Sequence, residues 1–279
     1  MLIRHCPCFQ FLEGGPRVNQ MRKSVCIEMV FTEVPFEDRF RLAKQAGFDY
    51  IEFWTWKDKN IERIKELCLA HDLKIASFSG DQEFSMVDED QSKDYIAFVE
   101  ASIETAQVLN CDHLVIHSNA LGENGVVIDP YSHISDAKKT VVVLDVLKSL
   151  AAMAEAANIT LLLEALNTVV DHPGNFLAYT KDAAKLIRIV SSSNIKILYD
   201  IYHMQIMEGN LIDTLKAHFD TIGYIHVADV PGRHEPGTGE INITNLMTVL
   251  RELNYDGFVG FELDPEQNST AAARAILSL

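Results

Sequence analysis

Short apolar runs alternate with longer amphipathic segments along the chain from residue 24 onward. Eight runs of about five or six residues are rich in Ile, Val, Leu, Phe or Tyr, which is typical of β-strands buried on both faces. The predicted strands cover residues 25–30, 50–54, 74–78, 113–117, 159–164, 195–200, 222–227 and 258–262.

Between these runs, apolar residues recur at three- and four-residue spacing, the period of an amphipathic helix. Eight strands that alternate with helices, without a linker or a break in composition, predict a single (β/α)8 barrel, or TIM barrel, over residues 21–279. The predicted helices cover residues 37–46, 61–71, 91–109, 135–157, 181–190, 211–219 and 243–253.

The alternative architecture is a doubly wound open sheet. Such a sheet usually carries a glycine-rich fingerprint after its first strand, whereas here the first run continues into FTEVPFEDRF. The first twenty residues lack clear periodicity, a hydrophobic signal-peptide region and a small-residue cleavage site. We interpret residues 1–20 as a disordered N-terminal extension or the product of an upstream start, with the natural start at Met21.

Composition narrows the choice of partners and compartment. The net charge is −16, which repels nucleic acid and anionic membranes, so we expect neither as a partner. No apolar run approaches the ~18 residues that span a bilayer. Five cysteines, an odd number without a CxxC pair, indicate reduced thiols in a cytoplasmic protein.

Candidate chemistry gathers at the ends of four successive predicted strands: Glu164, Asp200, His226 and Glu262. Barrel enzymes place their active sites at these ends, and neighbouring strands lie roughly 5 Å apart, so one ion can contact all four side chains. Three carboxylates and an imidazole favour Mn²⁺ or Mg²⁺, with Zn²⁺ or Co²⁺ as alternatives. A single acid at a strand end is usually solvated or caps a helix, but coincidence at four successive strands is far less expected.

Around these residues the sequence resembles the hydroxypyruvate isomerase family, within the xylose-isomerase-like barrels of sugar isomerases and epimerases. The resemblance runs from about residue 25 to 265, and its motifs around Asp200 and His226 are long and specific. The matching stretches are FTEVPFEDRF, GFDYIEFW, LLLEALN, YDIYHMQIMEGN, HVADVPGRHEPGTGE and GFVGFELDP.

The resemblance implies that the four strand-end residues hold a divalent metal and that Glu164 and Glu262 also form the acid–base pair. It further implies substrate-binding roles for His203 and Arg233, of which Arg233 could pair with a substrate carboxylate. His117 ends the fourth run at the same mouth, where substrate binding and a structural role are both open. Many relatives carry an arginine soon after EALN, whereas NTVVDHPGNF has none. The residue that would bind the far end of the substrate, and hence the identity of the substrate, is therefore left open.

The implied activity is proton transfer between adjacent carbons of a small α-hydroxy carbonyl compound through a metal-stabilised enediolate. Hydroxypyruvate–tartronate semialdehyde isomerase is the leading hypothesis, and 2-oxo-tetronate isomerase or ketose 3-epimerase are alternatives. A barrel like that of abasic-site endonucleases is less favoured, because the chain is acidic and only one histidine joins the proposed ligands. A barrel that binds sugars or metal without catalysis is also less favoured. The sequence does not fix the oligomeric state, although dimers or tetramers are common among similar barrels.

Overall fold

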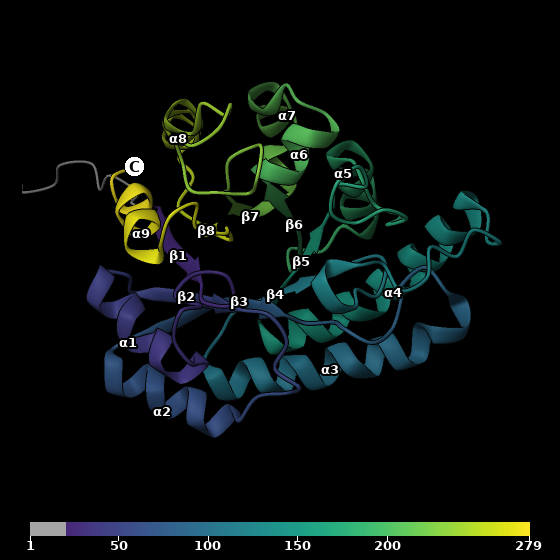
Figure 1. The fold of residues 1–279 in the computed structure, drawn as a ribbon. Coiled ribbons are helices and arrows are strands. Elements are labelled where there is room, and N and C mark those ends of the chain that lie inside the picture. The colour runs from purple at the N-terminus through teal and green to yellow at the C-terminus, as the bar shows by residue number, and fades with distance from the viewer. Residues whose placement is uncertain (1–20) are drawn as a thin grey trace, which may run out of the picture.

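The computed structural model describes residues 21–279, and in it eight parallel strands close into one barrel in chain order (Figure 1). The predicted (β/α)8 fold is confirmed, whereas the extension predicted for residues 1–20 lies outside the described part. The strands are β1 (Arg22–Cys26), β2 (Tyr50–Phe53), β3 (Lys74–Ser79), β4 (His113–Ile116), β5 (Thr160–Glu164), β6 (Ile195–Asp200), β7 (Ile222–His226) and β8 (Phe258–Phe261).

Helices surround the barrel, and α9 packs beside α1 where the ring closes between β8 and β1 (Figure 1). The seven predicted helices are confirmed to within one residue at each end, while α6 and α9 are additional. The helices are α1 (Phe36–Ala46), α2 (Ile61–His71), α3 (Ser92–Leu109), α4 (Asp136–Ala157), α5 (Thr180–Val190), α6 (Ile201–Met207), α7 (Leu211–His218), α8 (Ile243–Glu252) and α9 (Ser269–Leu277).

The predicted position of the first strand is wrong. The strand ends at Cys26, whose carbonyl accepts hydrogen bonds from the backbone N–H groups of Met29 and Val30 in a turn. Val30 is apolar because it is buried beneath this turn rather than within the sheet. The strand also begins earlier, because Arg22 and Lys23 pair with Phe258 and Val259 of β8. The guanidinium of Arg22 lies 3.8 Å from the centre of the Phe258 ring.

The barrel interior changes from apolar to polar toward the C-terminal ends of the strands. An apolar layer inside the barrel includes Leu162, Leu198, Tyr224 and Phe258. Next to it, Glu52 on β2 is a buried carboxylate that contacts the Tyr224 hydroxyl. This layer supports a polar site at the C-terminal mouth, the usual location in this fold.

The register of neighbouring strands places the predicted ligands at that mouth. Asp200 pairs with His226, and Glu164 on the preceding strand pairs with Leu198. Glu262 follows directly after β8. No helix within residues 21–279 is long and apolar enough to cross a membrane.

Candidate active site

A cavity of about 590 Å³ opens at the C-terminal ends of the strands. Asp200 is buried beside the residues that line this cavity. It forms one group of possible metal ligands with Glu164 and His203, and another with His226 and Glu262. The structure therefore brings all seven predicted site residues together. The predicted residues that line the cavity itself are His117, Glu164, His203, His226, Arg233 and Glu262.

His226 turns one ring nitrogen into the site and the other into the barrel. Its Nε2 lies 2.9 Å from Glu52 Oε2, to which it donates a hydrogen bond. Its Nδ1 faces Glu262 Oε2 at 3.7 Å and Asp200 Oδ2 at 4.0 Å. Burial opposes protonation, but Glu52, Glu262 and Glu164 outweigh it and raise the pKa of His226 to about 10. This imidazole therefore sits where positive charge is strongly favoured.

Glu52 fixes that orientation. Its carboxylate is 2% exposed and accepts hydrogen bonds from the hydroxyls of Ser24 and Tyr224 in addition to His226. A Cβ atom at Gly260 would collide with both the Glu52 carboxylate and the His226 ring, so β8 needs glycine at this point. A carboxylate that holds the far nitrogen of an imidazole is the usual support of a metal-binding histidine.

Asp200 and Glu262 flank the inner nitrogen of His226. Asp200 caps helix α6, because its Oδ1 accepts the backbone N–H of Tyr202 at 2.7 Å, while Oδ2 remains on the site side. Burial raises the pKa of Asp200 to about 7, although the positive charge of Arg233 acts to lower it. Glu262 is partly buried, with 14% of its side chain exposed, but Arg233 and His226 outweigh the desolvation and lower the pKa of its carboxyl group.

Arg233 lies against these carboxylates rather than in solvent. Its Nη2 donates to Glu262 and lies 3.8 Å from Asp200 Oδ2, and its guanidinium lies 5.1 Å from the centre of the Tyr202 ring. Burial opposes its charge, yet Glu262 and Asp200 raise the pKa of Arg233 above its ordinary value. The guanidinium is therefore in place beside the predicted metal ligands.

Glu164 faces the cavity from β5 and is held by His117. His117 Nε2 lies 3.1 Å from Glu164 Oε2, and its Nδ1 lies 3.0 Å from Asp81 Oδ1. Asp81 also accepts hydrogen bonds from the His117 backbone N–H and the Tyr95 hydroxyl. Burial lowers the pKa of His117, but Asp81 and Glu164 outweigh it and raise that pKa to about 10.

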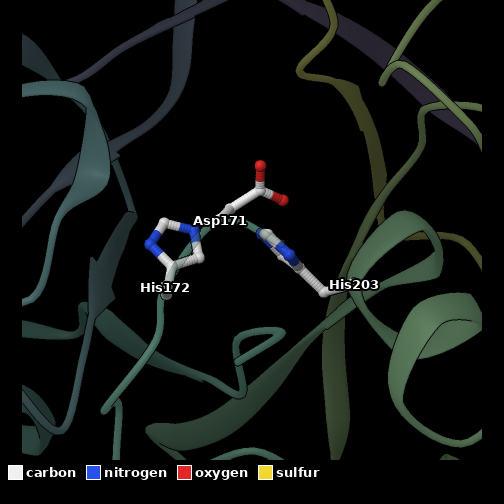
Figure 2. Close-up of side chains that lie close together, drawn as sticks. All are labelled: Asp171, His172 and His203. Atoms are coloured by element: carbon white, nitrogen blue, oxygen red, sulfur yellow. The ribbon is translucent and has the colours of Figure 1, made fainter. Parts of the chain in front are cut away.

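His203 belongs to a second group, with Asp171 and His172, whose potential ligand atoms lie within 4.8 Å of one another (Figure 2). All three residues already have a hydrogen-bond partner. Asn167 Nδ2 donates to Asp171 Oδ2 at 2.6 Å and to His203 Nδ1 at 2.7 Å. His172 Nδ1 donates to the Gly125 carbonyl at 2.7 Å. Because these ligand atoms are already hydrogen-bonded, we assign no cation to this group. Burial, followed by Arg233 and His172, lowers the pKa of His203 well below its ordinary value.

The glycine-rich end of HVADVPGRHEPGTGE is built around a buried carboxylate. Asp229 accepts the backbone N–H groups of Gly237, Gly239 and Ile241, each at 3.0 Å. A Cβ atom at Gly239 would collide with the carbonyl of Val230. These amides are occupied by Asp229 and cannot form a phosphate cradle.

The donor set fits a divalent cation. Within residues 21–279, His226 Nδ1 and Glu164 Oε1 are buried without a hydrogen-bond partner. Asp200 is shared by two groups whose ligand atoms lie within 4.8 Å of one another, one with Glu164 and His203 and one with His226 and Glu262. Oxygen-rich sets with one imidazole suit Mg²⁺ or Mn²⁺.

Three residues at the site are not among those that the sequence predicts for it: Glu52, Asp81 and Asn167. Trp54 lines the cavity and its Nε1 donates to Glu262 Oε1 at 2.6 Å. For Glu52 a signal exists, since a single acid inside the apolar run YIEF is unusual for a buried strand. Asp81 and Asn167 lie in loops, where polar residues carry no such signal.

Residues 40–279 match the xylose isomerase-like TIM barrel family. The chain belongs to this family. It is 33% identical to hydroxypyruvate isomerase of Escherichia coli, over 91% of this chain and 97% of that protein. It is 29% identical to 2-oxo-tetronate isomerase of Cupriavidus necator, over 88% and 93% of the two chains. The predicted resemblance is confirmed, and the chain is an enzyme of the isomerase class.

Solved structures of this barrel family agree with the fold. AP endonuclease, family 2, from Brucella melitensis superposes with a TM-score of 0.82 at 27% identity, over 91% of this chain and 96% of that one. The 3-keto-D-glucoside 4-epimerase of E. coli superposes with a TM-score of 0.78 at 25% identity, over 93% and 98%. Different reactions are therefore named for proteins of one barrel family, and the choice among them depends on the site.

Proposed function

We propose that this protein is a metal-dependent isomerase of a small α-hydroxy carbonyl compound, with hydroxypyruvate and tartronate semialdehyde as the leading substrate pair. The observation that carries the proposal is the pair Glu164 and Glu262, two carboxylates on the same cavity with Asp200 in contact range of both. Proton transfer between adjacent carbons needs groups of this kind close to the reacting carbons.

The metal would be held by Glu164, Asp200, His226 and Glu262. A bound divalent cation would supply Lewis-acid polarisation of the neighbouring carbonyl and hydroxyl oxygens of the substrate. The buried and unpartnered His226 Nδ1 supports this assignment. Manganese and magnesium suit the set best, since three of the four side chains offer oxygen.

Glu164 is the better placed proton acceptor of the two glutamates. His117 holds its Oε2, which leaves Oε1 without a hydrogen-bond partner among residues 21–279. Glu262 instead accepts from Trp54 on one oxygen and from Arg233 on the other, so its negative charge is stabilised and it is the weaker base. Glu164 therefore takes the proton from carbon, and the second glutamate completes the transfer.

Two further side chains would orient the substrate. Arg233 carries the positive charge needed to pair with the carboxylate of hydroxypyruvate, and its Nε has no acceptor within the described residues. His203 lines the same cavity and can hydrogen-bond a substrate oxygen.

A 2-oxo-tetronate isomerase is the second candidate, named for a relative that matches most of the chain. Beyond His203 the cavity continues to His172 and Asp171, a histidine with a free ring nitrogen and a carboxylate (Figure 2). Both are hydrogen-bond acceptors, which suits an additional substrate hydroxyl. An abasic-site endonuclease is disfavoured by the net charge of −16.

A substrate panel tests the proposal. The Mn²⁺-loaded protein is assayed with hydroxypyruvate, 2-oxo-tetronate and ketoses, beside the Glu164→Gln variant as a control for contaminating activity. Turnover of hydroxypyruvate that is lost in the variant supports the leading substrate. Turnover of 2-oxo-tetronate alone would favour the second candidate, and no turnover of any α-hydroxy carbonyl compound would refute the proposal.

A further inference from the structure

Asn167 is a fully buried residue three positions beyond Glu164, in the loop that follows β5. Its side-chain amide connects this loop to α6, because it contacts both Asp171 and His203. It does not line the cavity, so any influence on the reaction must pass through a neighbour.

The orientation of this amide follows from its partners. Oδ1 accepts the backbone N–H groups of Val170 at 2.9 Å and Asp171 at 3.0 Å. Backbone N–H groups can only donate, so this end of the amide must be the oxygen. The other end is therefore the NH₂ group, and it lies 2.6 Å from Asp171 Oδ2 and 2.7 Å from His203 Nδ1.

An NH₂ group has no acceptor, so His203 Nδ1 must accept and cannot carry a proton. In the neutral ring the proton then resides on Nε2. That nitrogen lies on the side of the predicted metal ligands, 3.6 Å from Asp200 Oδ2. The imidazole thus presents an N–H donor toward the site.

The three other imidazoles that line the cavity are held in the opposite way, and for His172 the acceptor is the Gly125 carbonyl. His226 and His117 each turn their far nitrogen to a carboxylate, that of Glu52 or Asp81, which requires a proton on that nitrogen. Among the cavity imidazoles within residues 21–279, only the one held by Asn167 is backed by a donor. This difference determines which site histidine can present a neutral N–H to a ligand.

We propose that Asn167 is a positioning residue that fixes His203 as the Nε2–H tautomer, so that this imidazole donates a hydrogen bond to a substrate oxygen. The donation to substrate rests on the proposed function, whereas the tautomer does not. An acceptor at position 167 should draw the proton to Nδ1, which would leave a lone pair on Nε2 and remove the donor from the site.

The tautomer can be measured by NMR of the full-length protein with ¹⁵N-labelled histidine, loaded with diamagnetic Mg²⁺. The His203→Phe variant assigns the signals of this ring. We expect an unprotonated Nδ1 and a protonated Nε2 in the wild type, and the reverse in Asn167→Asp. A protonated Nδ1 in the wild type, or the same tautomer in both proteins, would overturn the proposal.

Two further variants keep this test decisive. Asn167→Asp places a second carboxylate beside Asp171, so the double variant Asn167→Asp/Asp171→Asn keeps the loop charge while retaining an acceptor against His203. Asn175→Ala removes a buried amide of the same loop that bonds the Leu177 carbonyl and does not contact His203. We expect the double variant to show the reversed tautomer and the Asn175 control to show the wild-type one, and failure of either expectation counts against the proposal.

Kinetics separate this proposal from the proposed function. On a substrate that turns over, Asn167→Asp should lower kcat/KM by about 10- to 100-fold, the usual effect of losing a supporting partner. The Asn175→Ala control should change it much less at equal folding stability. If the tautomer is reversed in Asn167→Asp but the wild-type protein turns over no substrate, the proposed function alone is refuted. If Asn167→Asp shows the reversed tautomer and full activity, the role of the Nε2–H donor is refuted.

Discussion

The two halves of the barrel build the site in different ways. Strands β5 to β8 each end at, or directly before, a carboxylate or imidazole that belongs to the predicted metal site. The first half instead supplies Glu52 from β2 and Asp81 from the loop after β3, whose carboxylates hold His226 and His117. One half therefore presents the ligands. The other half fixes which nitrogen of His226 faces the site and holds His117, which in turn holds Glu164.

This division explains why the site residues in the second half of the chain are easier to predict from the sequence. A ligand at a strand end can be recognised from its own strand, because position along the strand fixes its place at the mouth. Glu52 acts on a residue 174 positions away, across the barrel, and its partner is known only once the ring is closed. The comparison predicts that loss of a ligand abolishes the chemistry, whereas loss of a supporting residue weakens it.

The largest effect is expected at the end of β5. Glu164→Gln removes the proposed proton acceptor while keeping the size of the side chain, and should lower kcat by about 10²- to 10⁴-fold. The thermal unfolding midpoint should change little, which circular dichroism checks. Wild-type turnover in a pure and folded variant would remove Glu164 from the reaction.

An intermediate effect is expected at β2. Glu52→Gln keeps the shape but weakens the hold on His226 Nε2, and should lower metal affinity by about 10- to 100-fold. Because hydrogen bonds to a charged group contribute about 1.5–3 kcal/mol, the free energy of unfolding should also fall by roughly that amount. Both are measurable, by calorimetric Mg²⁺ titration and by urea denaturation.

Ser24→Ala serves as the matched control for that variant. It removes another hydrogen bond to the Glu52 carboxylate but leaves the imidazole in contact with it. Metal affinity should then stay within a few-fold of wild type, as expected for a neutral hydroxyl donor. Equal losses of affinity in the two variants would mean that Glu52 acts through packing and not through His226.

The smallest effect is expected at the exposed rim. Trp54 is 46% exposed and donates one hydrogen bond to Glu262, so Trp54→Phe should cost about 1 kcal/mol, or about fivefold in kcat/KM. Steady-state kinetics at fixed metal concentration measure it. A loss as large as that of Glu164→Gln would show that the rim contributes more than orientation of one carboxylate.

The periodicity of the chain was enough to predict the barrel, seven helices and the strand ends that carry the ligands. It misplaced the first strand, because Val30 is apolar for burial beneath a turn and not for pairing. It missed α6, which begins directly after β6 with Asp200 as both strand end and helix cap. Asp81 and Asn167 could not be predicted, since their roles depend on hydrogen bonds that form only when loops meet.

Metal dependence is the central claim, and one measurement tests it most directly. The protein is stripped with a chelator, reloaded with Mn²⁺, and compared with Asp200→Asn for bound metal and for turnover of hydroxypyruvate and 2-oxo-tetronate. We predict one ion per chain in the wild type, turnover that disappears on stripping and returns on reloading, and weak binding in the variant. Full turnover by the stripped protein, or equal Mn²⁺ binding in the variant, would contradict the account.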